Sequence, residues 1–291
     1  MCSEFKANAK PHLQYLRIDF RKSWVLAIAA LPDRPLPMTK KPAWIIQKEK
    51  DRNAVSLWVF GIHAVRDALE NPSRVKKRLI VTKNAADRLE DAIRTAGIKP
   101  EIADARKFTA PLDPTSVHQG AALEVKPLDW GDLTALIPDG GRQTVLFLDR
   151  VTDPHNVGAI LRSAEVFGAC AVIAPVRHAA PETGALAKSA SGALERQPYL
   201  RVKNLSKAME SLKELGFFLI GLEGEAETTL EASLATAGDR VGLVLGAEGP
   251  GLREKTRETC DTLARVPFAR EFGSLNVSNA AAVALYAARQ T

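Results

Sequence analysis

The chain has 291 residues, a formal net charge of +6, 46% hydrophobic residues and 25% charged residues. These proportions are typical of folded globular proteins and argue against a fibrous or mainly disordered chain. Because the three cysteines, Cys2, Cys170 and Cys260, are odd in number and far apart, we expect no disulfide framework, no metal site and a reducing, cytoplasmic setting.

Residues 1–52 carry the entire charge excess. They contain eleven of the 40 Lys and Arg residues and five of the 34 Asp and Glu residues, so 29 of each sign remain in residues 53–291. Such a basic arm holds a polyanion through counterion release without selecting its sequence. The longest apolar run, Trp24–Leu31, is too short to cross a bilayer, and no cleavage pattern follows it. We expect a disordered extension rather than a targeting signal or membrane anchor, and Met38 stays open as an alternative start.

Residues 53–126 predict a small α/β domain. Strands are expected over Leu57–Phe60, over Leu79–Thr82, near Glu101 and over Ala121–Val125, and helices over 63–70 and 85–96. Arg74–Arg78 is the densest basic cluster outside the arm. It is equally consistent with direct RNA contact and with a solvated turn and strand edge.

Residues 127–142 lack a clear period and predict a linker with one helical turn inside it. Residues 143–291 predict a second α/β domain. Its short, continuous apolar strands alternate with helical patterns, which is typical of a buried parallel sheet. The expected strands are Val145–Leu148, Ala171–Ala174, Phe217–Leu222, Val241–Leu245 and Leu263–Val266.

Three segments of the second domain place glycine and polar residues where a strand ends, which is where open α/β sheets bind ligands. In the first segment, a polar loop leads into a helix near Pro154, and Gly158 and Arg162 share one face of that helix. The glycine leaves room for a ligand to approach under the guanidinium. The alternative is a glycine that allows close helix packing and an arginine that pairs with Glu165.

The second segment, Leu245–Leu252, has three glycines within six residues after a strand. This spacing is neither a dinucleotide fingerprint nor a Walker loop. Because glycines let a backbone pass close to a ligand, it indicates a cofactor loop of another kind. Glu248 within it is either a site residue or a surface acid that caps the helix expected near Leu252.

The third segment consists of Val266–Phe268 and, after a loop, Ser274–Asn279, which leads into an Ala-rich helix to Gln290. Ser274 or Asn276 is expected to cap the first turn of this helix. Because the helix is apolar or small on almost every side, we expect it to be buried and closely packed.

Together, the three segments resemble the three motifs of the SpoU, or TrmH-type, branch of the SPOUT RNA methyltransferases. The first motif is matched by Asn156, Gly158 and Arg162, the second by Gly246, Glu248 and Gly251, and the third by Pro267 and Ser274–Ser278. Order, spacing and position at strand ends agree from Val145 to Arg289.

The resemblance extends upstream. Phe60–Val65 and Val117–Gly120 resemble the ends of the small N-terminal domain of the bacterial 23S rRNA guanosine ribose methyltransferases, a domain similar to RNA-binding ribosomal proteins. Residues 1–52 have no counterpart in the family. Arg150 is a departure, because relatives often have glycine there, and it affects local loop shape.

The resemblance implies a fold that the strand–helix pattern does not predict. Connection rules make knots very rare, yet this family has a C-terminal trefoil knot. The resemblance also implies a homodimer formed through the C-terminal helices, S-adenosylmethionine as cofactor and no metal. The family's cofactor-binding residues correspond here to Leu245, Gly246, Gly251, Val266, Pro267, Phe268, Ser274, Leu275 and Asn276, and its catalytic residues to Asn156, Arg162, Glu248 and Asn276.

By this resemblance, the protein methylates a ribose 2′-hydroxyl, with a guanosine of 23S rRNA as the expected target. Arg162 is then expected to act at the cofactor pocket of the other protomer. Because a guanidinium stays protonated, we expect it to bind phosphate and stabilise the developing alkoxide rather than to act as a base. Glu248 either orients the target nucleoside or holds its own loop.

Other functions remain open. A tRNA ribose methyltransferase and a non-catalytic RNA-binding protein of the same fold are the main alternatives, whereas a Rossmann oxidoreductase is disfavoured because the dinucleotide fingerprint is missing. The residues alone do not identify the methylated nucleotide.

Overall fold

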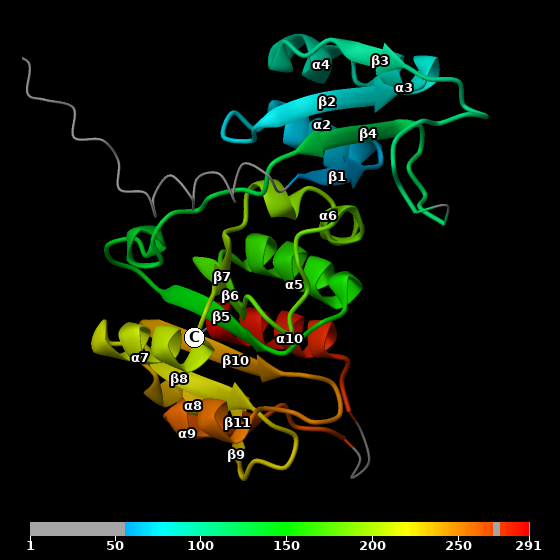
Figure 1. The fold of residues 1–291 in the computed structure, drawn as a ribbon. Coiled ribbons are helices and arrows are strands. Elements are labelled where there is room, and N and C mark those ends of the chain that lie inside the picture. Colours follow the sequence, from blue (N-terminus) through cyan, green and yellow to red (C-terminus); the bar gives the residue numbers. More distant parts are fainter. Residues whose placement is uncertain (1–55, 114, 270–273, 291) are drawn as a thin grey trace, which may run out of the picture. The chain divides into compact units, whose positions relative to one another are not determined.

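The computed structural model describes residues 56–113, 115–269 and 274–290. The predicted N-terminal extension, residues 1–52, lies outside these residues. No helix in the described part of the chain combines the length and apolar character that a membrane crossing requires. The described residues form two β-sheets, each with its own helices (Figure 1).

The small domain is built on a four-stranded sheet of order β1-β4-β2-β3. Its strands are β1 (Leu57–Phe60), β2 (Lys76–Val81), β3 (Pro100–Ile102) and β4 (Ala121–Val125). β4 pairs in antiparallel fashion with β1 and β2, and β3 joins β2 in parallel. The four predicted strands are confirmed, although β2 begins at Lys76 rather than at Leu79.

Three helices accompany this sheet: α2 (Ile62–Glu70), α3 (Lys83–Arg88) and α4 (Glu90–Ala96). The single helix predicted over 85–96 is wrong in one respect, because it is divided at Leu89. The backbone there leaves helical geometry, with φ −110° and ψ 8°, and the Leu89 side chain anchors the junction in the core. Gly97 ends α4 in the left-handed conformation, as its position in the sequence predicted.

The second domain is built on a seven-stranded sheet in which every neighbouring pair is parallel. Its order is β7-β6-β5-β10-β8-β11-β9. The strands are β5 (Gln143–Asp149), β6 (Ala171–Pro175), β7 (Tyr199–Val202), β8 (Phe218–Leu222), β9 (Thr228–Thr229), β10 (Arg240–Gly246) and β11 (Thr262–Arg265). The parallel sheet is confirmed. The two edge strands, β7 and β9, were not predicted because they are short and have no continuous apolar run.

Helices cover both faces of this sheet (Figure 1). Side chains of α5 (Pro154–Phe167), α6 (Gly184–Ala190), α8 (Leu230–Thr236) and α10 (Val277–Gln290) share one hydrophobic cluster, and α7 (Leu205–Glu214) contributes to the other, beside α9 (Glu254–Thr259). The predicted linker packs against this second cluster through Trp130, Leu133, Leu136 and Ile137. It contains the predicted helical turn, Thr134–Leu136, and is a packed segment rather than a free one.

The two domains meet along a seam. It is formed by β1 and Asn71–Arg74 on one side, and by α6 and the turn Ala193–Glu195 on the other. A Cβ on Gly184, the first residue of α6, would lie 2.3 Å from the carbonyl oxygen of Trp58. Only glycine permits so close an approach of the two backbones, so the seam is specifically packed.

Arg74 is the central charge of the seam. Its side chain is buried, and its guanidinium donates to Glu195 through Nε at 2.9 Å and through Nη2 at 2.7 Å. A second carboxylate, that of Glu182, lies 3.5 Å from Nη1. Neither interpretation of the cluster Arg74–Arg78 therefore describes Arg74, because a buried, paired guanidinium is neither solvated nor available to RNA.

Candidate active site

Motif residues from three distant segments meet at the carboxyl edge of the large sheet. Asn156 stands in the first turn of α5, Glu248 in the loop after β10, and Asn276 directly before α10. Asn276 Nδ2 donates to Glu248 Oε1 at 2.7 Å and to Asn156 Oδ1 at 3.0 Å. Asn156 Nδ2 donates to the same Glu248 oxygen at 3.2 Å. We call these three residues the polar triad.

The polar triad also caps α10. Asn276 Oδ1 accepts hydrogen bonds from Ser278 N at 2.9 Å and from Ser278 Oγ at 2.5 Å, so Asn276 is the N-cap and the expected cap is confirmed. Val277 N donates to Glu248 at 3.4 Å, which places this carboxylate at the positive end of the helix dipole. The prediction that Glu248 caps a helix near Leu252 is wrong, because the next helix, α9, begins at Glu254 and has Arg253 as its N-cap.

The loop after β10 closes on itself. Ala247 and Gly251 exchange backbone hydrogen bonds at 3.2 and 2.9 Å. A Cβ on Gly246 would lie 2.2 Å from the carbonyl carbon of Gly251. The glycine at 246 is therefore required by the fold of the loop, in addition to any approach of a ligand.

Asp149, at the end of β5, anchors this loop from below. It is fully buried, and its Oδ1 accepts from Arg253 Nε at 2.7 Å while its Oδ2 accepts from Arg253 N at 3.0 Å. We did not predict this residue. The signal was present, because an acid at the end of an apolar strand is costly to bury without a partner.

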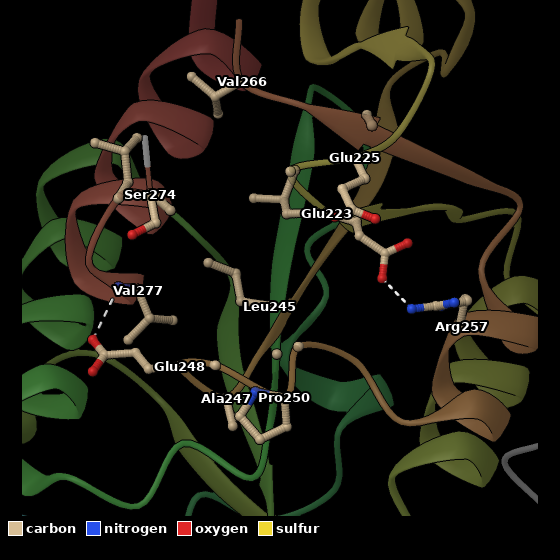
Figure 2. Close-up of a pocket in the computed structure, with 18 of the residues that line it drawn as sticks. Glu223, Glu225, Leu245, Ala247, Glu248, Pro250, Arg257, Val266, Ser274 and Val277 are labelled. Atoms are coloured by element: carbon tan, nitrogen blue, oxygen red, sulfur yellow. Dashed lines mark hydrogen bonds and ion pairs between the residues drawn. The ribbon is translucent and has the colours of Figure 1, made fainter. Parts of the chain in front are cut away.

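A cavity of 890 Å³ opens beside the polar triad, between the ends of β8, β10 and β11 and the start of α10 (Figure 2). Seven of the nine predicted cofactor-binding residues line it: Leu245, Gly246, Gly251, Val266, Phe268, Ser274 and Leu275. Pro267 and Asn276 are not among its lining residues. Pro267 is exposed, and the Asn276 side chain is turned into the polar triad.

The segment after β8 lines the cavity as well, and its residues were missed. These are Leu222, Glu223, Gly224 and Glu225. Glu223 forms an ion pair with Arg257 of α9, which also lines the cavity (Figure 2). The segment has no recognisable motif. Its position was the only signal, because β8 is a parallel strand whose carboxyl end lies at the same sheet edge.

The lining suits S-adenosylmethionine. Among the described lining residues, the charged ones are three acids, Glu223, Glu225 and Glu248, and one base, Arg257. A predominantly acidic lining favours a ligand with a sulfonium and an ammonium group and disfavours a dinucleotide phosphate. Apolar side chains and the backbone of the glycine-rich loop suit a neutral adenine ring, and the volume is within the range of small-molecule sites. Among the described residues, no group of three or more His, Cys, Asp or Glu side chains is placed to hold a metal ion.

Arg162 is not in the cavity of its own chain. Its side chain is exposed on α5, and no hydrogen bond or ion pair joins it to a described residue. Pairing with Glu165 is wrong, because Glu165 pairs with Arg196. The open space expected at Gly158 is also wrong. A Cβ there would lie 2.4 Å from Ser189 Cβ, so this glycine serves the close packing of α5 on α6.

Two family models match this chain. The one described as SpoU rRNA Methylase family matches residues 143–286, and the one described as RNA 2′-O ribose methyltransferase substrate binding matches residues 58–130. The chain is 39% identical to the 23S rRNA (guanosine-2′-O-)-methyltransferase RlmB of Escherichia coli K12 over 241 residues, which are 80% of this chain and 98% of the relative. It is 38% identical to RlmB of Vibrio cholerae over 238 residues, 79% of this chain and 95% of the relative.

Solved structures agree with this assignment. The SpoU methyltransferase AviRb from Streptomyces viridochromogenes, in complex with AdoMet, matches with a TM-score of 0.69 and 25% identity, over 84% of this chain and 93% of AviRb. The sequence matches cover both sheets and all three motifs. The chain belongs to the SpoU rRNA methylase family and is an S-adenosylmethionine-dependent RNA 2′-O-methyltransferase.

Proposed function

We propose that this protein transfers the methyl group of S-adenosylmethionine to the ribose 2′-hydroxyl of a guanosine in 23S rRNA, in the cytoplasm. Relatives that are named for this reaction match over both domains, and the substrate-binding model matches the small domain. The observation that carries the proposal is the polar triad at the rim of a cavity with a mainly acidic lining. A site for a hydroxyl-bearing acceptor then lies beside a site for a cationic donor.

Each part of the site has a separate task in this reaction. S-adenosylmethionine, when bound, supplies a methyl group on a sulfonium, which an oxygen nucleophile attacks in line. Leu245, Val266 and Phe268 offer apolar surface to the adenine, and the closed loop after β10 offers backbone donors and acceptors. The polar triad, whose members hold one another, orients the ribose at the rim of the cavity.

The active form is proposed to be a homodimer that packs on one face of α5 and α10. This open face consists of Arg162, Val166, Val283 and Tyr286, and its three apolar side chains are 67%, 41% and 55% exposed. It corrects the expectation that α10 is buried on almost every side. Arg162 lies four residues before Val166 and therefore on the same side of α5. A partner that covers the apolar residues receives this guanidinium, which would bind the RNA phosphate and stabilise the developing alkoxide in the partner's site.

Mixing two inactive variants tests whether Arg162 acts across the dimer. Arg162→Ala removes the guanidinium, and Val266→Trp fills part of the cavity. In mixed dimers, the intact cavity of one subunit faces the intact arginine of the other, so about one quarter of all sites become complete. Recovery of methyl transfer on mixing supports the proposal, and no recovery from subunits that co-purification of two different affinity tags shows to have exchanged refutes it.

The C-terminal segment is proposed to form the trefoil knot of the family. β11 pairs with β8 and β9, whereas the next element, α10, packs on α5 and on β10, the strand on the other side of β8. Contact between Val277 and Glu248, and the buried small residues Ala281, Ala284 and Ala288, support such a path. A stable domain fused to the C-terminus should slow refolding from urea far more than the same domain fused to the N-terminus. Equal refolding rates would refute the knot.

Mapping of 2′-O-methyl groups tests the reaction itself. Total RNA from cells with and without the gene should differ by one guanosine signal in the large ribosomal subunit. Loss of a signal in tRNA instead would establish the first alternative. Calorimetry with S-adenosylmethionine tests the second alternative, a non-catalytic RNA-binding protein of the same fold. Such a protein should give no heat of binding.

A further inference from the structure

The carboxyl edge of the large sheet has two unlike halves. The cofactor cavity lies over the ends of β10, β8 and β11. The ends of β5 and β6 lie on the other side of β10, because the sheet order is β7-β6-β5-β10-β8-β11-β9. Neighbouring strands are about 4.8 Å apart, so the ends of β5 and β6 are about 5 and 10 Å from the end of β10, the strand that leads to Glu248 of the polar triad.

Two arginines in this second half have no partner within the described chain. They are Arg150, directly after β5, and Arg177, in the loop after β6, and both side chains are exposed. The same holds for Arg162 on the open face. The other described arginines between residues 143 and 290 all donate to a carboxylate or a carbonyl: Arg196, Arg201, Arg240, Arg253, Arg257, Arg265 and Arg289. Lack of a partner is thus the exception among these arginines, and Arg150 and Arg177 both follow strand ends beside the site.

The loop that carries Arg177 is held rigidly from beneath. Arg201 of β7 donates to the carbonyl oxygens of Pro175 at 3.1 Å, Ala180 at 3.0 Å and Val176 at 2.6 Å. Ala180 N donates to Val151 O at 3.1 Å, which ties this loop to the one that carries Arg150. Both loops are therefore fixed in advance, which lowers the entropic cost of binding a ligand.

Arg150 adopts a backbone conformation that an arginine seldom takes. Its φ is +64°, in the left-handed region, and His178 in the neighbouring loop has φ +59°. Glycine adopts this conformation without steric cost, whereas a long side chain does not. Strained backbone of this kind persists where the surrounding structure enforces it, and it is frequent at functional sites. An arginine at position 150 therefore destabilises the fold relative to glycine. Because the residue gives the fold no visible benefit, a role in binding is favoured.

We infer that Arg150, Arg177 and His178 form a second binding site, which holds the sugar–phosphate backbone of the RNA next to the nucleotide under modification. We call it the strand-end site, and it rests on the proposed function. Guanidinium groups bind phosphate through paired hydrogen bonds, and an imidazole stacks on bases or donates to phosphate. With the cofactor on one half of the sheet edge and the RNA strand on the other, the target ribose lies over the polar triad between them.

Removal of single charges tests the strand-end site. The variants are Arg150→Gly and Arg177→Ala, with Arg150→Lys as a conservative rescue. Arg240→Gly is the matched control. Arg240 is the first residue of β10, so it lies at the amino ends of the strands, far from the strand-end site. The probes are a fluorescein-labelled single-stranded RNA for anisotropy and an unmodified 23S rRNA transcript for methyl transfer.

Each strand-end variant should raise the Kd for the labelled RNA and the KM for the transcript several-fold, with kcat and the Kd for S-adenosylmethionine nearly unchanged. The slope of log affinity against log salt should fall by about 0.7 per arginine removed, the value for one phosphate contact with a single strand. Arg150→Gly should melt no lower than the parent, because glycine relieves the strain, and Arg150→Lys should recover part of the affinity. The Arg240→Gly control should keep the parental affinity and slope.

Parental affinity and salt slope in both strand-end variants would overturn the inference, as would an equal loss in the control. This failure is distinct from failure of the proposed function. If the parent transfers no methyl group to the transcript, the proposed function fails, whereas the anisotropy measurements still decide whether the strand-end site binds RNA.

Discussion

Arg74 in the domain seam and Arg162 on the open face are the same residue type in opposite circumstances. Arg74 is buried, with Glu195 and Glu182 around its guanidinium, and it also donates to Lys126 O at 2.7 Å. Arg162 is exposed and has no partner among the described residues. A charge that is matched within the chain serves the architecture. For the unmatched one, which lies beside exposed apolar side chains, we propose a partner in the second subunit of a dimer.

Loss of Arg162 should give the largest functional effect. Arg162→Ala removes a group that we place at the developing negative charge, and loss of one such donor lowers kcat by roughly 10²–10³. The stability should barely change, because the side chain contacts no described partner. Rates of methyl transfer and the urea midpoint measure the two quantities.

Arg162→Lys is the informative companion. It keeps the charge but not the planar fork, so partial recovery supports phosphate binding by the guanidinium. A near-normal kcat in Arg162→Ala would show that Arg162 does not take part in the reaction. The proposed contrast between a functional Arg162 and a structural Arg74 would then be wrong.

Arg74→Met should have the opposite profile. It leaves Glu195 and Glu182 buried without their cation, and breaking a buried pair by removing one partner costs about 3–5 kcal/mol. Urea unfolding measures this loss. Arg78→Met is the matched control in the same cluster, because Arg78 pairs with Glu101 at the surface, where solvent screens the interaction. Equal destabilisation by the two variants would show that the seam has no special role.

Asn276→Ser should separate capping from the polar triad. Serine is also a good N-cap, so α10 should keep its start, but the donors to Glu248 and Asn156 are lost. We expect the unfolding free energy to fall by about 1 kcal/mol, the usual net value of a hydrogen bond. The loss of kcat should correspond to a larger rise in the activation free energy. If Asn276→Ser keeps the parental activity and stability while Asn276→Ala loses both, the triad hydrogen bonds contribute nothing beyond the cap.

The site residues that could be predicted from the sequence are those that belong to a short motif directly after a strand. Asn156, Glu248 and Asn276 follow strand ends, and the parallel sheet brings such ends to one edge, so their meeting could be expected from the pattern together with the family motifs. The same rule accounts for most of the cavity lining. It gave no sign of Glu223 and Glu225, because the segment that holds them matches no motif, although Gly224 lies between them.

Contacts between distant segments were beyond the sequence. Arg74 and Glu195 pair although they are 121 positions apart in the sequence. The residues around each of them contain no pattern that predicts this pairing. Gly158 was predicted to leave space for a ligand, but space depends on what packs there, and α6 fills it. Periodicity likewise could not show that one side of α10 stays exposed, because small and apolar residues occur on almost every side of this Ala-rich helix.

Glu182 provides the smallest effect and the finest test of the seam. Burial raises the pKa of this carboxyl above its usual value of 4.5, with nearby Glu195 acting in the same direction and Arg74 in the opposite one. The folded state therefore holds the proton more tightly than the unfolded state. This contribution to the unfolding free energy is fully present below pH 4.5 and is lost as the pH rises through the raised pKa. Glu182→Gln stays neutral, so the stability of the parent relative to this variant should decline towards neutral pH in urea titrations. A constant difference across that range would mean that Glu182 remains charged, and that the seam holds two full negative charges against one arginine.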